Sequence, residues 1–194
     1  MPNNESYISH IFHKKNAIPN KTCKELIDLF ESNKSHHQLG PQNEWCRKHN
    51  KYFFSVISIN LNNTNFIKDF ILPNTDKYVK SNKYLSSLNV GIELEDIVNL
   101  QKYQPGHYYS LQHHETTRPE TRSRALAWMI YLNDIKQGGG GTAFPQQDFI
   151  TEPSAGDLYI WPADWTYSHY GLPAEKEEKY LINGWLKFAY PGEK

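Results

Sequence analysis

Two histidines and one glutamate have the residue types and spacing of a metal site. His113 and Glu115 stand two residues apart, with His114 between them. Side chains at i and i+2 of a strand point to the same face, so we expect His113 and Glu115 to reach one metal while His114 points away. A second histidine would complete a facial triad, a ligand set that leaves positions on the metal open.

His169 is the candidate for that further ligand. It follows a β-prone run and precedes the turn at Gly171, and ten residues after it Lys179 opens an apolar run that reaches Trp185. A buried ammonium without a partner is costly, so a buried Lys179 needs an anion. The pattern alone leaves a second interpretation open, in which Lys179 is the exposed start of a strand.

The elements before residue 93 read as a helical and loop-rich shell. Thr22 with Glu25 is a capping-box signal, and apolar residues at helical spacing predict a helix from Thr22 to about Ser32. Surface or capping roles suffice for the histidines of this region: His10, His13, His36, His37 and His49.

Two more elements are expected in the same region. The run from Tyr52 to Ile59 is aromatic and β-branched and predicts a strand, after a polar loop over residues 40–51. Residues 66–85 have helical character, with an interruption or a restart of the helix expected around Pro73.

From residue 93 to residue 190, short β-prone runs alternate with glycine and proline turns. The runs are Ile97–Tyr103, Ala125–Leu132, Asp157–Trp161 and Tyr180–Ala189. Many short strands, together with abundant tyrosine and tryptophan, predict a mainly β, sandwich or barrel-like core. Because the sequence has no internal repeat and no low-complexity linker, we expect one domain over residues 1–194, with a shell at 1–92 and the β core at 93–190.

Six motifs follow one another between Leu100 and Trp185. They are Tyr103-Gln104-Pro105-Gly106, His113-x-Glu115, Arg124 to Asn133, Gly139 to Pro145, Pro153 to Asp157, and His169 with Lys179. In this order they resemble the prolyl 4-hydroxylase-like branch of the 2-oxoglutarate/Fe(II) oxygenases.

The resemblance implies a double-stranded β-helix (jelly-roll, cupin-like) core with flanking N-terminal helices. It implies a dioxygenase that couples oxidative decarboxylation of 2-oxoglutarate to hydroxylation of peptidyl proline or a related substrate. The implied cofactors are Fe(II), 2-oxoglutarate and O2, and ascorbate stays open as a further one. Because Glu115 supplies a carboxylate that related halogenases lack, hydroxylation is the expected outcome.

Carried over residue by residue, the resemblance makes His113, Glu115 and His169 the iron ligands. Lys179 pairs with the distal carboxylate of 2-oxoglutarate. Tyr131, Tyr103 and Thr142 are implied to hydrogen-bond the same co-substrate, and Met129 and Trp185 to form apolar pocket walls. Ordinary packing in the β core remains an equal explanation for Tyr131 and Trp185.

The sequence departs from the family pattern at three places. Glu115 replaces the commoner aspartate, and Gly141 stands where a glutamate is often found. Tyr109 precedes the first ligand by four residues, where the family has three. A strict register from Tyr109 would pair Gln112 with His114, which supplies no carboxylate, so His114 is kept only as a reserve ligand.

Two other function classes stay open: a non-catalytic binding module on the same fold, and a cupin-like metalloenzyme that does not use 2-oxoglutarate. The prime substrate is a peptide, a protein or a small molecule. The charged loop 116–122 either contacts that substrate or is a solvated loop, and Trp161 and Trp165 either line the entrance or pack the core.

Composition narrows the partners. The formal net charge is zero and the pI is about 7.1, so no nucleic-acid partner is expected. Cys23 and Cys46 are the only cysteines, a pattern typical of free thiols in a reducing compartment. With neither a signal peptide nor a membrane span in the sequence, we expect a soluble cytoplasmic protein of open oligomeric state.

Overall fold

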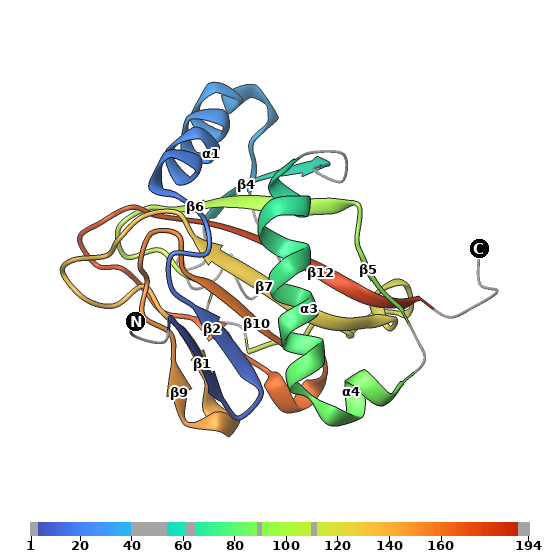
Figure 1. Ribbon diagram of the computed structural model, residues 1–194. Helices are drawn as coiled ribbons and strands as arrows, with labels where there is room; N and C mark the ends of the chain where they lie inside the picture. Colours follow the sequence, from blue (N-terminus) through green and yellow to red (C-terminus); the bar gives the residue numbers. More distant parts are fainter. Residues whose placement is uncertain (1–3, 40–53, 61–64, 89–90, 110–111, 190–194) are drawn as a thin grey trace.

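Two antiparallel sheets form the body of the protein (Figure 1). The structure is a computed structural model and describes residues 4–39, 54–60, 65–88, 91–109 and 112–189. The large sheet has the order β1 (Glu5–Ile8), β2 (Ile11–Lys14), β10 (Leu158–Pro162), β7 (Arg124–Tyr131), β12 (Lys179–Ala189), β6 (Ile97–Tyr103), β4 (Phe54–Asn60) and β3 (Gln38–Leu39), and β5 (Gly91–Leu94) also pairs with β12. The small sheet has the order β11 (Tyr170–Gly171), β8 (Thr142–Phe144), β9 (Phe149–Ile150).

Strand β12 is the spine of the large sheet, with β7 on one side and β6 and β5 on the other. Because side chains alternate along a strand, its residues separate into two sets. Leu181 packs with Tyr103, Met129 and Phe144, in a core cluster that joins the large sheet to β8 of the small one. The odd-numbered residues of β12, including Lys179, therefore lie on the face that points toward the small sheet.

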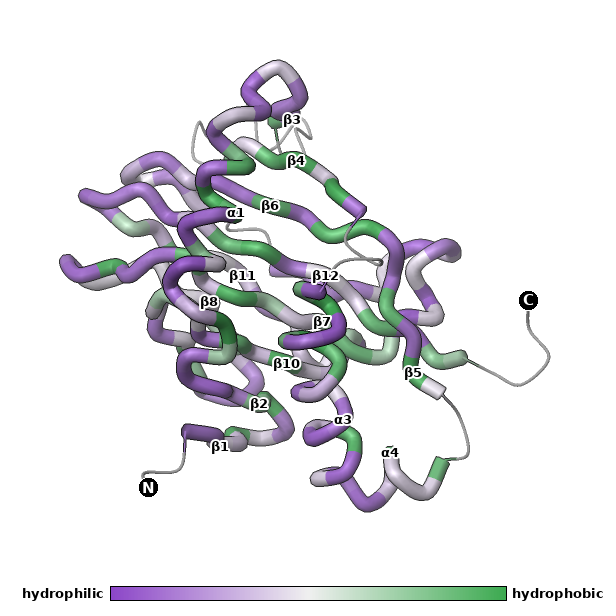
Figure 2. Tube along the Cα trace, turned by 45° about the horizontal axis from the view of Figure 1, so that its top comes forward, coloured by the Kyte–Doolittle hydropathy of each residue, from purple (hydrophilic) through white to green (hydrophobic). Residues whose placement is uncertain are grey.

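The other face of the large sheet is covered by helices. Ile182 and its even-numbered neighbours pack in a second core cluster with apolar residues of α1 (Asn20–Ser32) and of the segment that ends in α3 (Leu72–Ser81). Figure 1 shows α3 lying across the strands, and Figure 2 shows hydrophobic residues recurring along strands such as β6 and β12. Helix α4 (Lys83–Ser87) follows α3, and short helical turns lie at Lys34–His36 (η1), Pro119–Thr121 (η3), Pro145–Gln147 (η4) and Trp165–Tyr167 (η5).

The four strands expected after residue 93 are confirmed as β6, β7, β10 and β12, with ends shifted by a residue or less. The strand expected at Tyr52–Ile59 is confirmed as β4 from Phe54 onward. Tyr52, Phe53, the loop at 40–51, Cys46 and His49 lie outside the described residues.

The first helix is confirmed, but its expected capping box is wrong. Helix α1 begins at Asn20, and Pro19 is its N-cap, with no side-chain hydrogen bond. The N–H of Cys23 already donates to the carbonyl of Pro19, so Thr22 lies inside the first turn and is not the cap. Pro19 suits the position directly before the helix, because its ring fixes φ near the helical value.

The segment 66–85 is helical, and the restart expected around Pro73 is confirmed. A π-helical turn, η2 (Ile67–Ile71), leads directly into α3, which begins at Leu72 and has Pro73 in its first turn. A further break, not expected, comes at Asn82, whose side-chain oxygen accepts the N–H groups of Tyr84 and Leu85 and caps α4. An asparagine cap of this kind starts a new helix.

The N-terminal shell also contributes strands that the sequence did not reveal. Strand β2 pairs with β1 and with β10, and thereby extends the large sheet. His13 on β2 is not a plain surface residue: its ring stacks on Tyr159 and its Nε2 lies 2.8 Å from the carboxylate of Asp157. The description of residues 1–194 as one domain stays a prediction.

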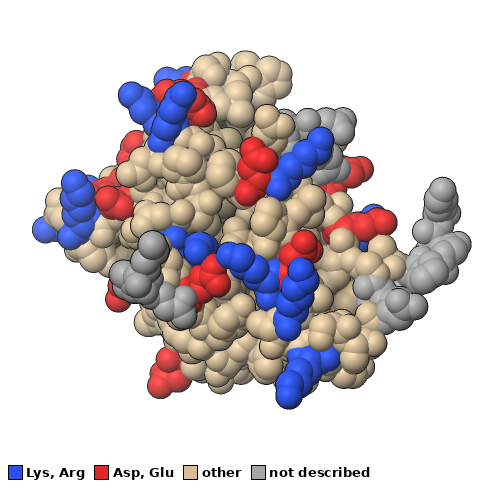
Figure 3. Space-filling model, viewed as in Figure 1, with Lys and Arg blue, Asp and Glu red and all other residues tan. Residues whose placement is uncertain are grey.

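Charged side chains of both signs are interspersed on the face shown in Figure 3. This mixture does not favour a nucleic-acid partner. The expectation that the protein has no such partner stays a prediction. Among the described residues, no helix combines the length and the apolar character needed to cross a membrane. Cys23 is a buried free thiol, as expected.

Candidate metal centre

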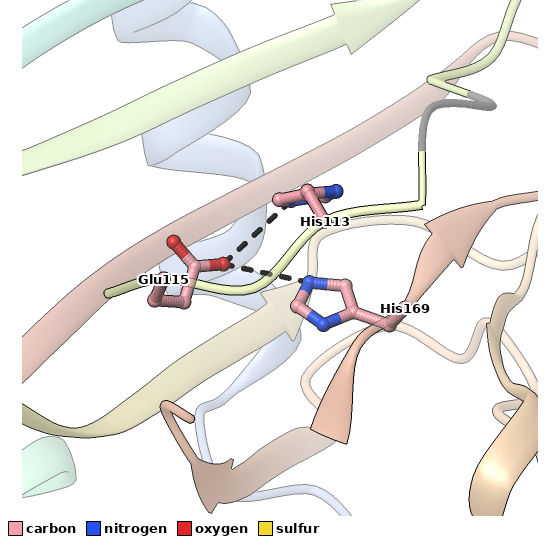
Figure 4. A group of neighbouring side chains, drawn as sticks. All are labelled: His113, Glu115 and His169. Carbon is pink, nitrogen blue, oxygen red and sulfur yellow. Dashed lines mark ion pairs between the residues drawn. The ribbon is translucent and has the colours of Figure 1, made fainter. Parts of the chain in front are cut away.

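The structure brings His113, Glu115 and His169 together (Figure 4). One ligand atom from each lies within 4.8 Å of the others. Glu115 Oε1 is 3.7 Å from His113 Nε2 and 3.5 Å from His169 Nε2. His114 is not part of this cluster, because its Nδ1 bonds to Thr116 Oγ1 at 3.0 Å.

The backbone positions these three side chains. His113 and His169 form an isolated antiparallel bridge, and the N–H of Glu115 donates to the carbonyl of Ala163 at 3.0 Å. The segment is not a regular strand, since Glu115 already lies in a turn. The two side chains nevertheless converge as expected, because His113 is tied to His169 and Glu115 to Ala163 by backbone hydrogen bonds.

A second contact orients the ring of His169. Its Nδ1 bonds to the carbonyl of Tyr167 at 3.0 Å, and a carbonyl only accepts, so Nδ1 carries a proton and Nε2 is the atom directed toward Glu115, where a metal can replace a proton. The ring packs between Phe144 and Trp161, with centroids at 5.2 and 5.1 Å. Of the two tryptophans with open roles, Trp161 is therefore a buried wall beside a ligand, whereas Trp165 is 69% exposed.

Glu115 is nearly buried and ionised. Burial raises the pKa of its carboxyl, but the hydrogen bond and charge of His169, the charge of His113 and the Trp185 indole outweigh burial and lower the pKa to about 2. The N–H of Trp185 donates to Glu115 Oε2 at 2.7 Å, so Trp185 is more than the apolar wall expected from the sequence. The sequence contains a signal for this inward position. Trp185, like Lys179, is an odd-numbered residue of β12, so both side chains start from the same face of the strand.

Two imidazoles and one carboxylate that converge on one point fit a mid-series transition metal. The set supplies three ligands and leaves coordination positions open, the arrangement of non-haem Fe(II) oxygenases. The carbonyl of Tyr167 and the indole of Trp185 are outer partners of the kind that orient metal ligands.

Lys179 opens β12 and is buried, 2% exposed, so the alternative of an exposed strand start is wrong. Its ammonium donates to the carbonyls of Gly140 and Leu172 at 3.0 and 3.2 Å and lies 4.4 Å from the centre of the Tyr103 ring. Among the described residues, no carboxylate pairs with it. Burial lowers the pKa of this amine to about 7.

Polar side chains near Lys179 form a small hydroxyl cluster. The hydroxyl of Tyr131 lies 2.6 Å from Thr151 Oγ1 and 3.2 Å from Thr142 Oγ1. Thr142 also contacts the sulfur of Met129, an inward-facing residue as expected. Thr151 was not expected, because a single threonine carries no pattern. The hydroxyl of Tyr103 donates to Gln101, so its role toward the co-substrate stays a prediction.

A comparison with protein families matches residues 98–187 to the 2OG-Fe(II) oxygenase superfamily. The match spans β6 to β12 and includes the triad and Lys179. Residues 98–187 therefore belong to the 2OG-Fe(II) oxygenase superfamily. The cofactors of this superfamily are Fe(II), 2-oxoglutarate and O2. No match was found among curated proteins.

Solved structures with the same fold include three prolyl hydroxylases. A viral collagen prolyl hydroxylase from Paramecium bursaria Chlorella virus 1, in complex with 2OG, has a TM-score of 0.68 at 19% identity, over 94% of this chain and 97% of that one. A Pseudomonas putida prolyl-4-hydroxylase has a TM-score of 0.67 at 20% identity, over 94% of each chain. A Trichoplax adhaerens prolyl hydroxylase, in complex with a peptide of hypoxia inducible factor, has 0.66 at 17%, over 92% and 83%. The expected double-stranded β-helix fold is confirmed.

Gly141 has a steric reason to depart from the family pattern. A Cβ at this position would lie 2.3 Å from the carbonyl oxygen of Thr151 and 3.0 Å from Ile150. The glycine lets β9 approach the start of β8, and that approach brings Thr151 to the hydroxyl of Tyr131. The glutamate seen elsewhere in the family has no room here.

The loop 116–122 is mostly exposed and contains the turn η3. A groove of about 530 Å³ lies between this loop and the helices, lined among others by Thr116, Arg122, Tyr78 and Tyr84. A contact of the loop with substrate stays a prediction.

Proposed function

We propose that this protein is a 2-oxoglutarate- and Fe(II)-dependent hydroxylase of peptidyl proline or a related peptide residue, with His113, Glu115 and His169 as iron ligands. One observation carries the proposal. His169 of the triad packs on Phe144, and Lys179 lies over the ring of Tyr103, and both rings belong to the core cluster between the sheets. No carboxylate of the described chain neutralises this buried amine.

Each residue has a role that its surroundings permit. The triad holds the metal and leaves positions open. Lys179 pairs with the distal carboxylate of 2-oxoglutarate, a charge-assisted contact that removes the cost of its burial. Tyr131 and Thr142 offer hydroxyls to the same carboxylate. When bound, Fe(II) with 2-oxoglutarate and O2 supplies the oxidation, in which decarboxylation to succinate is coupled to insertion of an oxygen atom into a substrate C–H bond.

The substrate class is argued by likeness. Structures that share the fold include a collagen prolyl hydroxylase and a prolyl hydroxylase with a bound peptide fragment. We propose a peptide substrate for the present chain on that ground. A cytoplasmic location and a need for ascorbate also stay predictions; cell fractionation and omission of ascorbate from the assay test them.

Anaerobic addition of Fe(II) and then 2-oxoglutarate tests the site. We expect a metal-to-ligand charge-transfer band in the visible range that needs both additions. Loss of the band in Lys179→Ala, with metal affinity unchanged, would assign Lys179 to the co-substrate. A native protein with well-occupied iron and no band would contradict the proposed function.

Turnover separates the remaining alternatives. A binding module releases no succinate from 2-oxoglutarate, and a cupin-like enzyme keeps its activity in Lys179→Ala. We expect succinate release that increases with proline-containing peptides, and a mass increase of one oxygen atom on the accepted peptide.

A further inference from the structure

The two oxygens of Glu115 have different partners. Oε1 faces His113 and His169 at 3.7 and 3.5 Å. Oε2 accepts the indole N–H of Trp185 at 2.7 Å and lies 3.6 Å from Nη1 of Arg124. The contacts of Oε2 therefore hold the carboxylate in place, and Oε1 is the oxygen directed toward the two histidines.

The groups that hold Oε2 are themselves fixed. Arg124 donates from Nε and Nη2 to the two oxygens of Glu95, both at 2.8 Å, and its guanidinium lies 3.7 Å from the centre of the Trp185 ring. The backbone N–H of Glu95 donates to the carbonyl of Trp185 at 2.9 Å. Glu95, Arg124 and Trp185 thus form a closed ring of contacts, which we name the carboxylate clamp.

We propose that the carboxylate clamp positions Glu115 as a metal ligand that binds through Oε1 alone. This inference rests on the proposed function, because it assigns the metal to the triad. The clamp occupies Oε2 and leaves Oε1 for the metal, which keeps a coordination position open. Residues that act on a ligand from outside in this way typically change metal affinity 10- to 100-fold.

The extra methylene of Glu115, compared with aspartate, has a role in this arrangement. Glu115 starts from a turn held to Ala163 and has to reach both the histidines and the indole on β12. An aspartate carboxylate is about 1.5 Å shorter in reach, so when one of its oxygens binds the metal the other falls short of the Trp185 indole.

Glu95 has a second effect through Arg124. A guanidinium beside a carboxylate tends to bind both of its oxygens. The paired bonds to Glu95 keep the guanidinium away from Oε1, where it would compete with the metal.

Metal titration tests the carboxylate clamp without turnover. Co(II) is added to the metal-free protein, and its dissociation constant and visible spectrum are measured. Trp185→Phe keeps a ring under Arg124 and removes the N–H; we expect 10- to 100-fold weaker binding and an altered spectrum. Glu95→Gln, at a partly exposed position, is expected to weaken binding in the same direction.

Trp128→Phe is the matched control. Trp128 is fully buried on the opposite face of β7, and within the described chain its Nε1 has no hydrogen-bond partner. We expect this variant to lower the melting temperature of the metal-free protein while Co(II) affinity stays within twofold. Equal affinity losses in Trp185→Phe and Trp128→Phe would mean that Trp185 is merely structural.

A double-mutant cycle with Glu115→Asp gives an independent answer. If Trp185 acts through Oε2, Trp185→Phe changes Co(II) affinity less than threefold in the aspartate background. The same 10- to 100-fold loss in both backgrounds would overturn the clamp. A native protein that binds no Co(II) contradicts the proposed function itself, whereas native binding with unchanged affinity in Trp185→Phe contradicts only the clamp.

Discussion

His113 and His169 donate backbone hydrogen bonds to one another, from His113 N to His169 O at 3.0 Å and from His169 N to His113 O at 2.9 Å. Two candidate ligands from distant parts of the chain are thereby held at a spacing that the backbone sets. Their rings lie 4.5 Å apart, centroid to centroid. Backbone hydrogen bonds, and not only the metal, therefore set the spacing of these two ligands.

A metal site made of residues from distant parts of the chain predicts a thermal shift on metal binding, because the unfolded chain does not bring these ligands together. A ligand that binds only the folded state at about 100 times its dissociation constant stabilises by about 2.7 kcal/mol. We expect Co(II) or Mn(II) to raise the melting temperature of the native protein by several degrees. Each of His113→Ala, Glu115→Ala and His169→Ala is expected to remove that rise, as followed by differential scanning calorimetry.

His114→Ala is the control for this series. Its ring bonds to Thr116 and lies outside the triad, so the metal-induced shift is expected to stay as large as in the native protein. A loss of the shift in His114→Ala that equals the loss in His113→Ala would favour the other register of this segment.

The strands and the triad were predictable because local patterns carry them. Alternating apolar runs define β6, β7, β10 and β12, and an H-x-E with a distant histidine and lysine defines the candidate ligands. The ends of these strands agree with the sequence because glycine and proline turns bound them.

The outer contacts were not predictable, because they join residues that no local pattern links. Thr151 meets Tyr131, and Glu95 meets Arg124, only once the sheets have formed. Strands β1 and β2 are short and lack a clear alternation, so pairing with β10 decides their structure. Sequence periodicity reports which face a residue takes, and not which partner it finds there.

The hydroxyl of Tyr131 is expected to contribute to 2-oxoglutarate binding. Burial raises the pKa of this tyrosine to about 12, so the hydroxyl keeps its proton and acts as a donor. Tyr131→Phe is expected to weaken 2-oxoglutarate binding by about 1 kcal/mol, the usual contribution of one hydrogen bond. Isothermal titration of the Co(II)-loaded protein measures this change.

Tyr159→Phe is the comparison for Tyr131→Phe. The hydroxyl of Tyr159 donates to the carbonyl of Glu152 and takes no part in the hydrogen bonds of the hydroxyl cluster. Its removal is expected to leave 2-oxoglutarate affinity within twofold. Equal effects of the two variants would show that the hydroxyl of Tyr131 serves only packing.

Gly141→Ala is expected to destabilise the protein through a close contact. The added Cβ meets the carbonyl of Thr151, a backbone atom that yields only if β9 moves. We expect a loss of about 2–3 kcal/mol in the free energy of unfolding, typical of overpacking. In Gly138→Ala the added Cβ lies in open space, and the only strain comes from the positive φ. We therefore expect a loss of about 1 kcal/mol in the free energy of unfolding there. Urea denaturation measures both, and equal losses would contradict the steric explanation.

The lowered pKa of Lys179 predicts that the protein takes up a proton when it binds 2-oxoglutarate. In the free protein burial lowers the pKa of this amine to about 7, and the groups around it are the ring of Tyr103 and two carbonyls, none of them anionic. At about pH 8 the amine is mostly neutral, whereas a carboxylate partner requires the charged form. Affinity is therefore expected to be highest below pH 7 and to fall about tenfold per unit above it.

Titration calorimetry in buffers of different ionisation enthalpy counts the protons taken up. We expect about one proton at pH 8 and about none at pH 6. Lys179→Arg separates this effect from other titrations, because a guanidinium stays charged throughout. Its 2-oxoglutarate affinity, even if weaker overall, is expected to be flat between pH 6 and pH 9. If Lys179→Arg kept the native pH dependence, the titrating group would be another residue. That result would contradict the assignment of Lys179 to the co-substrate site.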